Sequence, residues 1–346
     1  MKILYSIQAT GNGHIARASE LVPFLTRYGK VDVFLSGSNS SLGTTLPVKY
    51  KSKGLSLFYG NRGGLDYWKM LKAFSPLRII QEARALPVEK YDIVLNDFES
   101  ITSLACNIKK VPFIHFGHQA SFLSPHTPRP SKKDIAGECI LKHYAASRHS
   151  IGLHFKKYDD FIYSPVIKEK ILQSDPVDNG HITVYLSHYS DAVVEKALSA
   201  VKDAQFHVFS KVRTSIERKG NIVFMPVNNE GFTQSMLSSH GIITGAGFET
   251  PAETLYLGKK LICLPIQGQY EQFCNAEALK DFNTPIVHSI TDTFPELIRN
   301  WMNAAGQQSL TLDHSTASII EKVMEKANDI LEHRHYSYSP DLNFSL

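Results

Sequence analysis

The sequence predicts an α/β protein in which two doubly wound parallel-sheet domains follow each other along the chain. Its length of 346 residues suits two domains of ordinary size. Short apolar runs alternate with stretches of helical periodicity, which is typical of βαβ units whose sheets are covered on both faces. The alternation stops at a passage rich in proline and charge, SPVIKEKILQSDPVDNG, and then starts again. This break predicts a linker between the two domains.

Five apolar runs predict the strands of the first half. They cover residues 2–7, 31–35, 56–59, 93–95 and 113–116. Apolar residues at helical spacing predict a helix between the first two strands. Residues 120–150 begin with prolines and lysines and predict a loop followed by a helix. We expect the first domain to span residues 1–160 and the linker to span residues 161–180.

The second half repeats this organisation without repeating the sequence. Strands are predicted at 181–187, 206–210, 222–225, 241–244 and 260–264. Helices are predicted at 190–202 and from about Thr250 and Tyr270. We expect the second domain to span residues 181–314. A last helix, about 315–332, is expected to cross back with the tail towards the first domain, within a segment spanning 315–346.

The composition is that of an ordinary globular protein, with 43% hydrophobic and 20% charged residues. A net charge of +4 gives no indication of nucleic-acid binding. The four cysteines are scattered without a C-x-x-C pair, which favours free thiols in a reducing compartment. The apolar run at the N-terminus is too short for a signal-peptide core or a membrane span. We therefore expect a cytoplasmic protein, monomeric or homodimeric, with peripheral contact at the inner face of a membrane left open.

The loop after the first strand, Gly11-Asn12-Gly13-His14-Ile15-Ala16, fits the dinucleotide pattern G-x-G-x-x-A. A site for NAD also requires an acidic residue at the end of the second strand, whereas Asp32 lies at its start. The two glycines instead predict a sharp turn that presents His14 at a helix N-terminus. That position disfavours the imidazolium form and favours a neutral base. The alternative is a histidine that only caps the helix.

Asp97 directly follows the strand at 93–95 and is expected at the same sheet edge as His14. A carboxylate there can orient the imidazole and leave its other nitrogen as a general base. Two alternatives remain open. Asp97 or Ser100 could cap the next helix, or Asp97 and Glu99 could bind a metal ion, although no third ligand is evident.

The densest run of unusual residues is GIITGAGFETPAETLYLGKKLICLPIQGQYEQFCNAEALKDF. Gly245, Ala246 and Gly247 offer bare backbone amides before a helix N-terminus, and with Thr250 they predict an anion site. Glu253, one turn into that helix, could hold a diol such as a ribose. After the next strand, Gln269, Glu271 and Gln272 could bind several sugar hydroxyls.

This combination resembles the GT-B glycosyltransferases, most closely the group of the peptidoglycan lipid-intermediate N-acetylglucosaminyltransferase and related transferases. The resemblance rests on the G-x-G-H loop at 11–14, the central linker and the block G-x-E-T-x-x-E…Q-x-E-Q-x-x-N-A at 247–276. It implies two Rossmann-like domains that face a central cleft, with the acceptor bound by the first domain and the nucleotide sugar by the second. It also implies that His14 acts as the base and that Asp97 orients it.

The resemblance extends to the donor site. It implies that Glu253 binds the ribose and that Glu271 and Gln272 bind the donor sugar. Glu271 departs from the glutamine of the peptidoglycan enzymes, which leaves the donor sugar open. Ser187 corresponds to a second donor-phosphate loop, where His188 stands in place of a glycine as a possible cationic contact. Met225 lies where relatives pack backbone against the nucleotide base.

The sequence thus predicts a glycosyltransferase that moves a sugar from a nucleoside-diphosphate sugar, with uridine as the expected nucleoside, to an acceptor hydroxyl. We expect an inverting displacement that uses neither metal nor cofactor. A nucleotide-sugar 2-epimerase and a non-catalytic nucleotide-sugar-binding protein are the alternatives. The acceptor is open between a lipid-linked one and a small glycan. Aromatic and basic residues mixed within 57–85 suggest contact with a membrane that carries a lipid-linked acceptor, and a buried helix with a basic face is the other interpretation of this segment.

Overall fold

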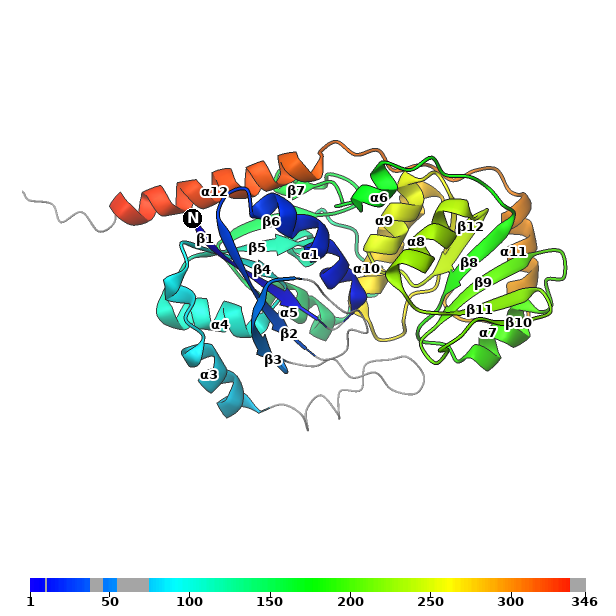
Figure 1. The fold of residues 1–346 in the computed structure, drawn as a ribbon, viewed down its shortest axis with the longest axis horizontal. Coiled ribbons are helices and arrows are strands. Elements are labelled where there is room, and N and C mark those ends of the chain that lie inside the picture. Colours follow the sequence, from blue (N-terminus) through cyan, green and yellow to red (C-terminus); the bar gives the residue numbers. More distant parts are fainter. Residues whose placement is uncertain (10, 38–45, 55–74, 337–346) are drawn as a thin grey trace, which may run out of the picture.

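The structure is a computed structural model that describes residues 1–9, 11–37, 46–54 and 75–336. It has two parallel-dominated sheets, one in each half of the chain, with helices on both faces (Figure 1). The α/β class with two doubly wound sheets is therefore confirmed. The predicted strand 56–59, the aromatic residues of 57–74 and the tail after residue 336 lie outside the described residues.

Among the residues that the structure describes, the first sheet has seven strands in the order β3-β2-β1-β4-β5-β6-β7, and all of its pairs are parallel. Its strands are β1 (Lys2–Gln8), β2 (Lys30–Ser36), β3 (Val48–Ser52), β4 (Ile93–Asp97), β5 (Phe113–Gly117), β6 (His149–Leu153) and β7 (Ile162–Tyr163). Residues of β1 alternate between two cores. Ile3, Tyr5 and Ile7 face one core, and Leu4 faces the other. The sheet extends to Tyr163, inside the segment predicted as linker, and the predicted boundaries at 160, 180 and 314 stay predictions.

The second sheet has six strands in the order β10-β11-β9-β8-β12-β13, with β10 antiparallel at one edge. Its strands are β8 (His181–Tyr185), β9 (Gln205–Ser210), β10 (Glu217–Lys219), β11 (Ile222–Pro226), β12 (Gly241–Thr244) and β13 (Lys260–Cys263). In both sheets the chain reverses direction across the sheet beside the first strand of that half. This is where ligands bind in open α/β sheets.

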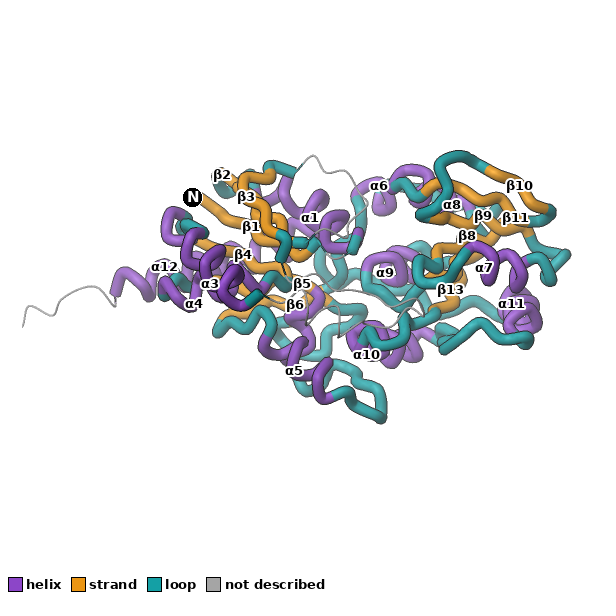
Figure 2. Tube along the Cα trace, turned by 90° about the horizontal axis from the view of Figure 1, so that it is seen from below, coloured by secondary structure: helices purple, strands orange, loops and turns teal. Residues whose placement is uncertain are grey.

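Helices cover both faces of each sheet. In the first half they are α1 (Asn12–Leu25), α3 (Pro76–Ala85), α4 (Ser100–Lys109) and α5 (Ile135–His143), with the 3-10 helices η1 (Val88–Lys90) and η2 (His118–Leu123). In the second half they are α6 (Glu169–Leu172), α7 (Asp191–Leu198), α8 (Asn229–Ser238), α9 (Glu249–Tyr256), α10 (Tyr270–Leu279), η3 (Lys280–Phe282), α11 (Phe294–Asn303) and α12 (Thr316–Tyr336). Figure 2 shows α9 and α10 between the two sheets.

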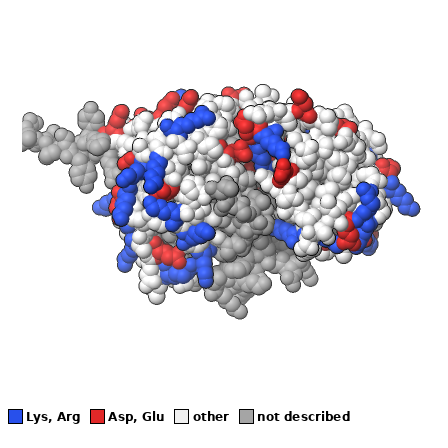
Figure 3. Space-filling model, viewed as in Figure 1, with Lys and Arg blue, Asp and Glu red and all other residues white. Residues whose placement is uncertain are grey.

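The last helix, α12, returns to the first half of the molecule, where it packs on α1 (Figure 1). Its buried face, which includes Ile319, Ile320 and Val323, joins a hydrophobic core that continues from the first sheet to α8 and α9. The two halves therefore share buried apolar contacts. On the face seen in Figure 3, basic and acidic side chains lie interspersed on both halves. Within the described ranges, no helix is long and apolar enough to cross a bilayer.

The apolar strands were the ones the sequence predicted. Three parallel strands of the first sheet, β3, β6 and β7, were not predicted, and β7 has only two residues. β3 has the sequence VKYKS and lies at the sheet edge, where alternating lysines face solvent. β6 has the sequence HSIGL and is apolar only at its end. Both runs are too polar for the apolar pattern expected of a parallel strand buried on both faces.

Candidate active site

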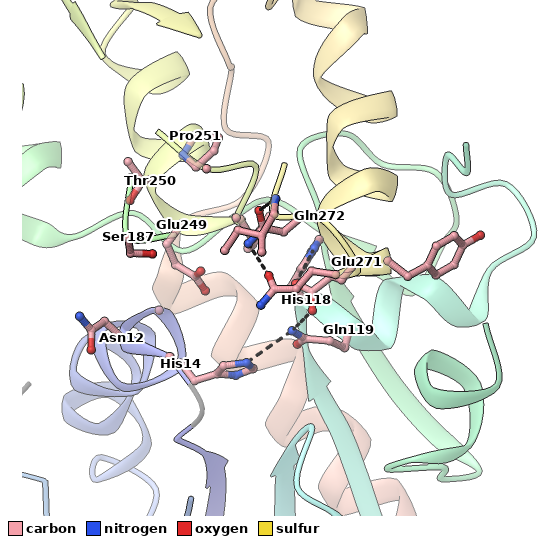
Figure 4. A pocket seen from close by; sticks show the side chains of 18 of the residues that line it. Asn12, His14, His118, Gln119, Ser187, Glu249, Thr250, Pro251, Glu271 and Gln272 are labelled. Atoms are coloured by element: carbon pink, nitrogen blue, oxygen red, sulfur yellow. Dashed lines mark hydrogen bonds and ion pairs between the residues drawn. The ribbon is translucent and has the colours of Figure 1, made fainter. Parts of the chain in front are cut away.

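A cavity of about 510 Å³ lies between the two halves of the chain. Most of the residues predicted for the site line it (Figure 4). These are Gly11, Asn12, Gly13, His14, Ser187, Gly245, Gly247, Thr250, Gln269, Glu271 and Gln272. Of the other predicted site residues, Asp97 lies behind His14, whereas Ala246, Met225 and Glu253 are outside the lining.

His14 and Asp97 meet because β1 and β4 are parallel neighbours. The register pairs Ile7 with Asp97, so both strands end at the same edge, and α1 starts shortly after β1. His14 Nδ1 lies 2.9 Å from Asp97 Oδ1. This contact places the Nδ1 proton on the side of the carboxylate. The other nitrogen, Nε2, faces the cavity, with Gln119 Nε2 at 3.4 Å. The arrangement is that of a base oriented by a buried acid.

Arg17, one turn further along α1, is the second partner of Asp97. Its Nη2 donates to Asp97 Oδ1 and Oδ2 at 2.7 and 2.9 Å, and its Nη1 donates to Glu249. Arg17 Nη2 also lies 3.1 Å from His14 Nδ1. Because Arg17 Nη2 and His14 Nδ1 are both donors here, they share the Asp97 carboxylate as their acceptor. Tyr5 adds a hydroxyl 3.3 Å from Asp97 Oδ2.

These charges decide the protonation of the pair. Burial alone would raise the pKa of Asp97, but Arg17 and His14 hold it well below its usual range. Burial lowers the pKa of His14, while Asp97 and Glu249 raise it, and the net shift is upward from its ordinary value. The neutral form that the helix N-terminus was expected to favour is therefore opposed by the nearby carboxylates. His14 is consequently a stronger base than a free imidazole.

The alternatives for Asp97 can be examined directly. Glu99, rather than Asp97 or Ser100, caps helix α4, and its carboxylate accepts from the backbone amides of Ile101 and Thr102 at 2.9 and 2.6 Å. The capping interpretation of Asp97 and Ser100 is thus wrong. Because Glu99 is committed to these amides, it does not converge with Asp97. Among the described residues, no group of three His, Cys, Asp or Glu side chains is placed to hold a metal ion.

The predicted anion site lies at the start of α9. Gly245, Gly247 and Thr250 line the cavity there, as does Ser187. Ala246 is fully buried, and its carbonyl accepts from Asn275 Nδ2 at 3.1 Å, so it supports the loop from behind. A helix N-terminus with bare amides suits an anion such as a phosphate.

The surroundings of His188 and Glu253 bear on the roles predicted for these two residues. Burial lowers the pKa of His188 to about 4, so a cationic contact to phosphate is not supported at neutral pH. Glu253 is 2% exposed, and Lys168 Nζ lies 3.1 Å from each of its carboxylate oxygens. Binding of a ribose by Glu253 stays a prediction, and it requires Lys168 to share or release the carboxylate.

The polar loop after β13 continues the lining. Glu271 accepts from Gln119 Nε2 at 3.0 Å, so it is held across the cavity from the first half. Gln272 Oε1 accepts from the backbone amide of Ile266 at 3.0 Å, and Gln272 Nε2 lies 2.5 Å from Gln269 Oε1. These side chains are thus held in place by hydrogen bonds within the protein. Whether they bind the donor sugar stays a prediction.

Sequence reasoning missed several residues of this site, among them four with charged or hydrogen-bonding side chains. Arg17, Gln119 and Glu249 line the cavity beside the predicted base, and His118 stacks on Phe248 with ring centroids 3.8 Å apart. His118 and Gln119 directly follow β5, so the strand-end rule that found Asp97 applies to them as well. Arg17 and Glu249 lie within helices, and no local pattern indicates that they meet.

Several solved structures share the fold of this chain. The chain is similar to Arabidopsis thaliana UGT89C1 in complex with UDP, with 16% identity, a TM-score of 0.58 and coverage of 94% of both chains. It is similar to the spinosyn forosaminyltransferase SpnP (13% identity, TM-score 0.56, 95% of this chain and 99% of that one). It is also similar to Acinetobacter baumannii MurG (14% identity, TM-score 0.52, 95% of both chains). The shared fold is GT-B, as predicted.

The family follows from the sequence. The model described as glycosyl transferase family 1 matches residues 1–305, and the chain belongs to this family. The protein is therefore a glycosyltransferase, which confirms the predicted class of enzyme. No curated protein sequence matches the chain.

Proposed function

We propose that this glycosyltransferase transfers a sugar from a nucleoside-diphosphate sugar, with uridine diphosphate as the first nucleotide to test, to an acceptor hydroxyl, and that His14 is the base. The observation that carries the proposal is the position of His14. Its Nδ1 is engaged by Asp97, and its Nε2 faces a cavity that also contains the N-terminus of α9. A base and an anion site thus face the same space.

The reaction follows from this placement. The acceptor hydroxyl gives its proton to His14 Nε2, and its oxygen forms a bond with the anomeric carbon of the donor. The bond from that carbon to the phosphate oxygen breaks, and the nucleoside diphosphate leaves with the bonding electron pair. The amides at the start of α9 and the hydroxyl of Thr250 are placed to stabilise the departing charge. A single displacement inverts the anomeric centre.

The donor is identified most directly by thermal shift. A panel of nucleoside diphosphates and nucleotide sugars is added to the protein, and the melting temperature is measured. A ligand present at a hundred times its Kd stabilises the protein by ~2.7 kcal/mol. Each donor that binds is then incubated alone. Interconversion of the free nucleotide sugar would indicate an epimerase, and tight binding without turnover against every acceptor offered would indicate a sensor.

The base is tested by His14→Ala, with Gln119→Ala as the matched variant on the other side of Nε2. A general base contributes ~10²–10⁴-fold, so His14→Ala is expected to lower kcat by about that factor. Gln119→Ala removes a neighbour of Nε2 without removing the base and should cost less. Turnover of His14→Ala within a few-fold of wild type would end the assignment.

A further inference from the structure

A buried cation joins the two halves of the molecule beside the base. Arg17 is 3% exposed and belongs to α1 in the first half. Its two terminal nitrogens bind carboxylates from different halves, because Nη2 donates to Asp97 and Nη1 to Glu249. Glu249 is the first residue of α9, the helix whose N-terminus is the predicted phosphate site. One guanidinium therefore connects the His14–Asp97 pair to the donor side of the cavity.

The backbone is shaped for this contact. A Cβ atom on Gly13 would lie 2.5 Å from Glu249 Oε2, so any side chain at residue 13 would displace the carboxylate. Gly13 has no positive φ, and space rather than backbone freedom explains the glycine. In Figure 4 the Glu249 side chain points from α9 towards the helix that carries Asn12 and His14.

Charge explains why the contact matters. A buried guanidinium requires carboxylate partners, and planar bidentate geometry suits arginine better than lysine for contacting two of them. If the halves moved apart, Arg17 would lose Glu249 and Asp97 would be its remaining carboxylate. The contact also directs the Glu249 carboxylate towards the first half.

We propose that Arg17 and Glu249 are positioning residues, which align the His14–Asp97 pair with the donor-binding helix α9 when the two halves are in contact. The proposal rests on the proposed function, since it assigns the alignment of that same site. Neither residue takes part in bond making. Arg17 acts through Asp97, and Glu249 acts through Arg17 and through its charge near His14.

The surroundings of His14 give a signature that simple packing would not produce. The charged and titratable groups that face it are Asp97 from β4, Arg17 from its own helix, Glu249 from α9, and Glu271 from α10 through Gln119, with Tyr5 of β1 behind Asp97. Glu249 raises the pKa of His14, and Arg17 lowers it. Removing the two charges should therefore move this pKa in opposite directions.

The test uses Glu249→Gln, Arg17→Gln and the double variant in the full chain. Histidine NMR measures the pKa of His14, which should fall in Glu249→Gln and rise in Arg17→Gln. The acid limb of kcat/KM, which rises as His14 loses its proton, should move to lower pH in Glu249→Gln. Each single variant should lose about 10- to 100-fold in kcat, because small misplacements of reacting groups cost up to ~10²-fold. The double variant should lose little more than the worse single variant.

Controls make the outcome decisive. Arg299→Gln and Asp203→Asn break an exposed pair at 3.5 Å, with Arg299 on α11, and should leave kcat and the pKa of His14 unchanged. If Arg17→Gln fails to fold, Glu249→Gln still tests the proposal, since Glu249 keeps 19% side-chain exposure. An unchanged pKa of His14 in Glu249→Gln, or losses that multiply in the double variant, would overturn the inference. Full activity of His14→Ala would instead overturn the base assignment, and the NMR titration would still decide the inference.

Discussion

Replacing Asp97 with asparagine tests the buried charge network at its centre. Asparagine keeps the shape of the side chain and one acceptor oxygen but removes the charge. Asp97 is fully buried and binds Arg17, which is also buried. Removing one partner of a buried ion pair costs ~3–5 kcal/mol. Arg17 retains Glu249, so we expect the lower end of this range, about 3 kcal/mol.

Urea unfolding and calorimetry measure this loss. For a domain of the size of the first half, ~2–4 °C are lost per kcal/mol, which predicts a fall in Tm of about 6–12 °C. The matched control is Asp32→Asn in strand β2 of the same sheet. Asp32 is paired with Lys49 at 2.6 Å, but that lysine is half exposed, so the control should lose clearly less stability. Equal losses in the two variants would refute the argument that burial makes the Asp97 network special.

The pH dependence of stability gives a second readout of the same change. Because the pKa of Asp97 in the folded protein lies well below its usual range, the ionised form stabilises the fold. This contribution is complete above the unfolded pKa of ~3.9 and is lost as the pH falls below it towards the folded value. The wild-type protein should therefore lose its higher free energy of unfolding, relative to Asp97→Asn, as the solution becomes acidic. If the difference in the free energy of unfolding between the two proteins stayed constant down to about pH 2, it would contradict the pairing of Asp97 with Arg17 and His14.

Two further predictions concern the leaving group and the contact between the halves. Chelation by EDTA should leave the rate of transfer unchanged, because amides at the start of α9 and Thr250 are proposed to hold the leaving charge; a loss that Mg²⁺ restores would contradict that role. Gly137→Ala should destabilise by ~1–3 kcal/mol in urea unfolding, although alanine is the better helix former, because its Cβ would overlap the side chain of Tyr270. Gly306→Ala, where nothing lies within 4 Å, is its control, and a stabilised Gly137→Ala would refute the close packing of α5 on α10.

The sequence predicted those features that depend on local pattern. Apolar runs located the inner strands, and the rule that ligands bind at strand ends placed His14 and Asp97 at one sheet edge from the sequence alone. The register Ile7 to Asp97 confirms that the two strands end side by side. The predicted donor loop also lines the cavity with the base, at Gly245, Gly247 and Thr250.

The remaining features depend on how the halves meet, which no local pattern specifies. Arg17 and Glu249 are 232 residues apart in the chain. Their contact requires a helix from each half to approach end to end, and Gly13 permits it. Lys168 similarly reaches Glu253 only because the linker passes α9. A residue pattern predicts which side chains lie at a sheet edge, but it does not predict which partner arrives from the other half.

The balance of charge in the site favours the proposed chemistry. When His14 is neutral, the two negative charges of Asp97 and Glu249 exceed the positive charge of Arg17 by one unit. An anionic donor would increase this excess of negative charge. When His14 takes the acceptor proton, the imidazolium compensates that excess beside two carboxylates. The network is therefore better matched to the state after proton transfer than to the state before it, and only such differential stabilisation accelerates a chemical step. The carboxylate of Glu249, which would repel a donor phosphate if it stood alone, is useful here because Arg17 directs it towards the base.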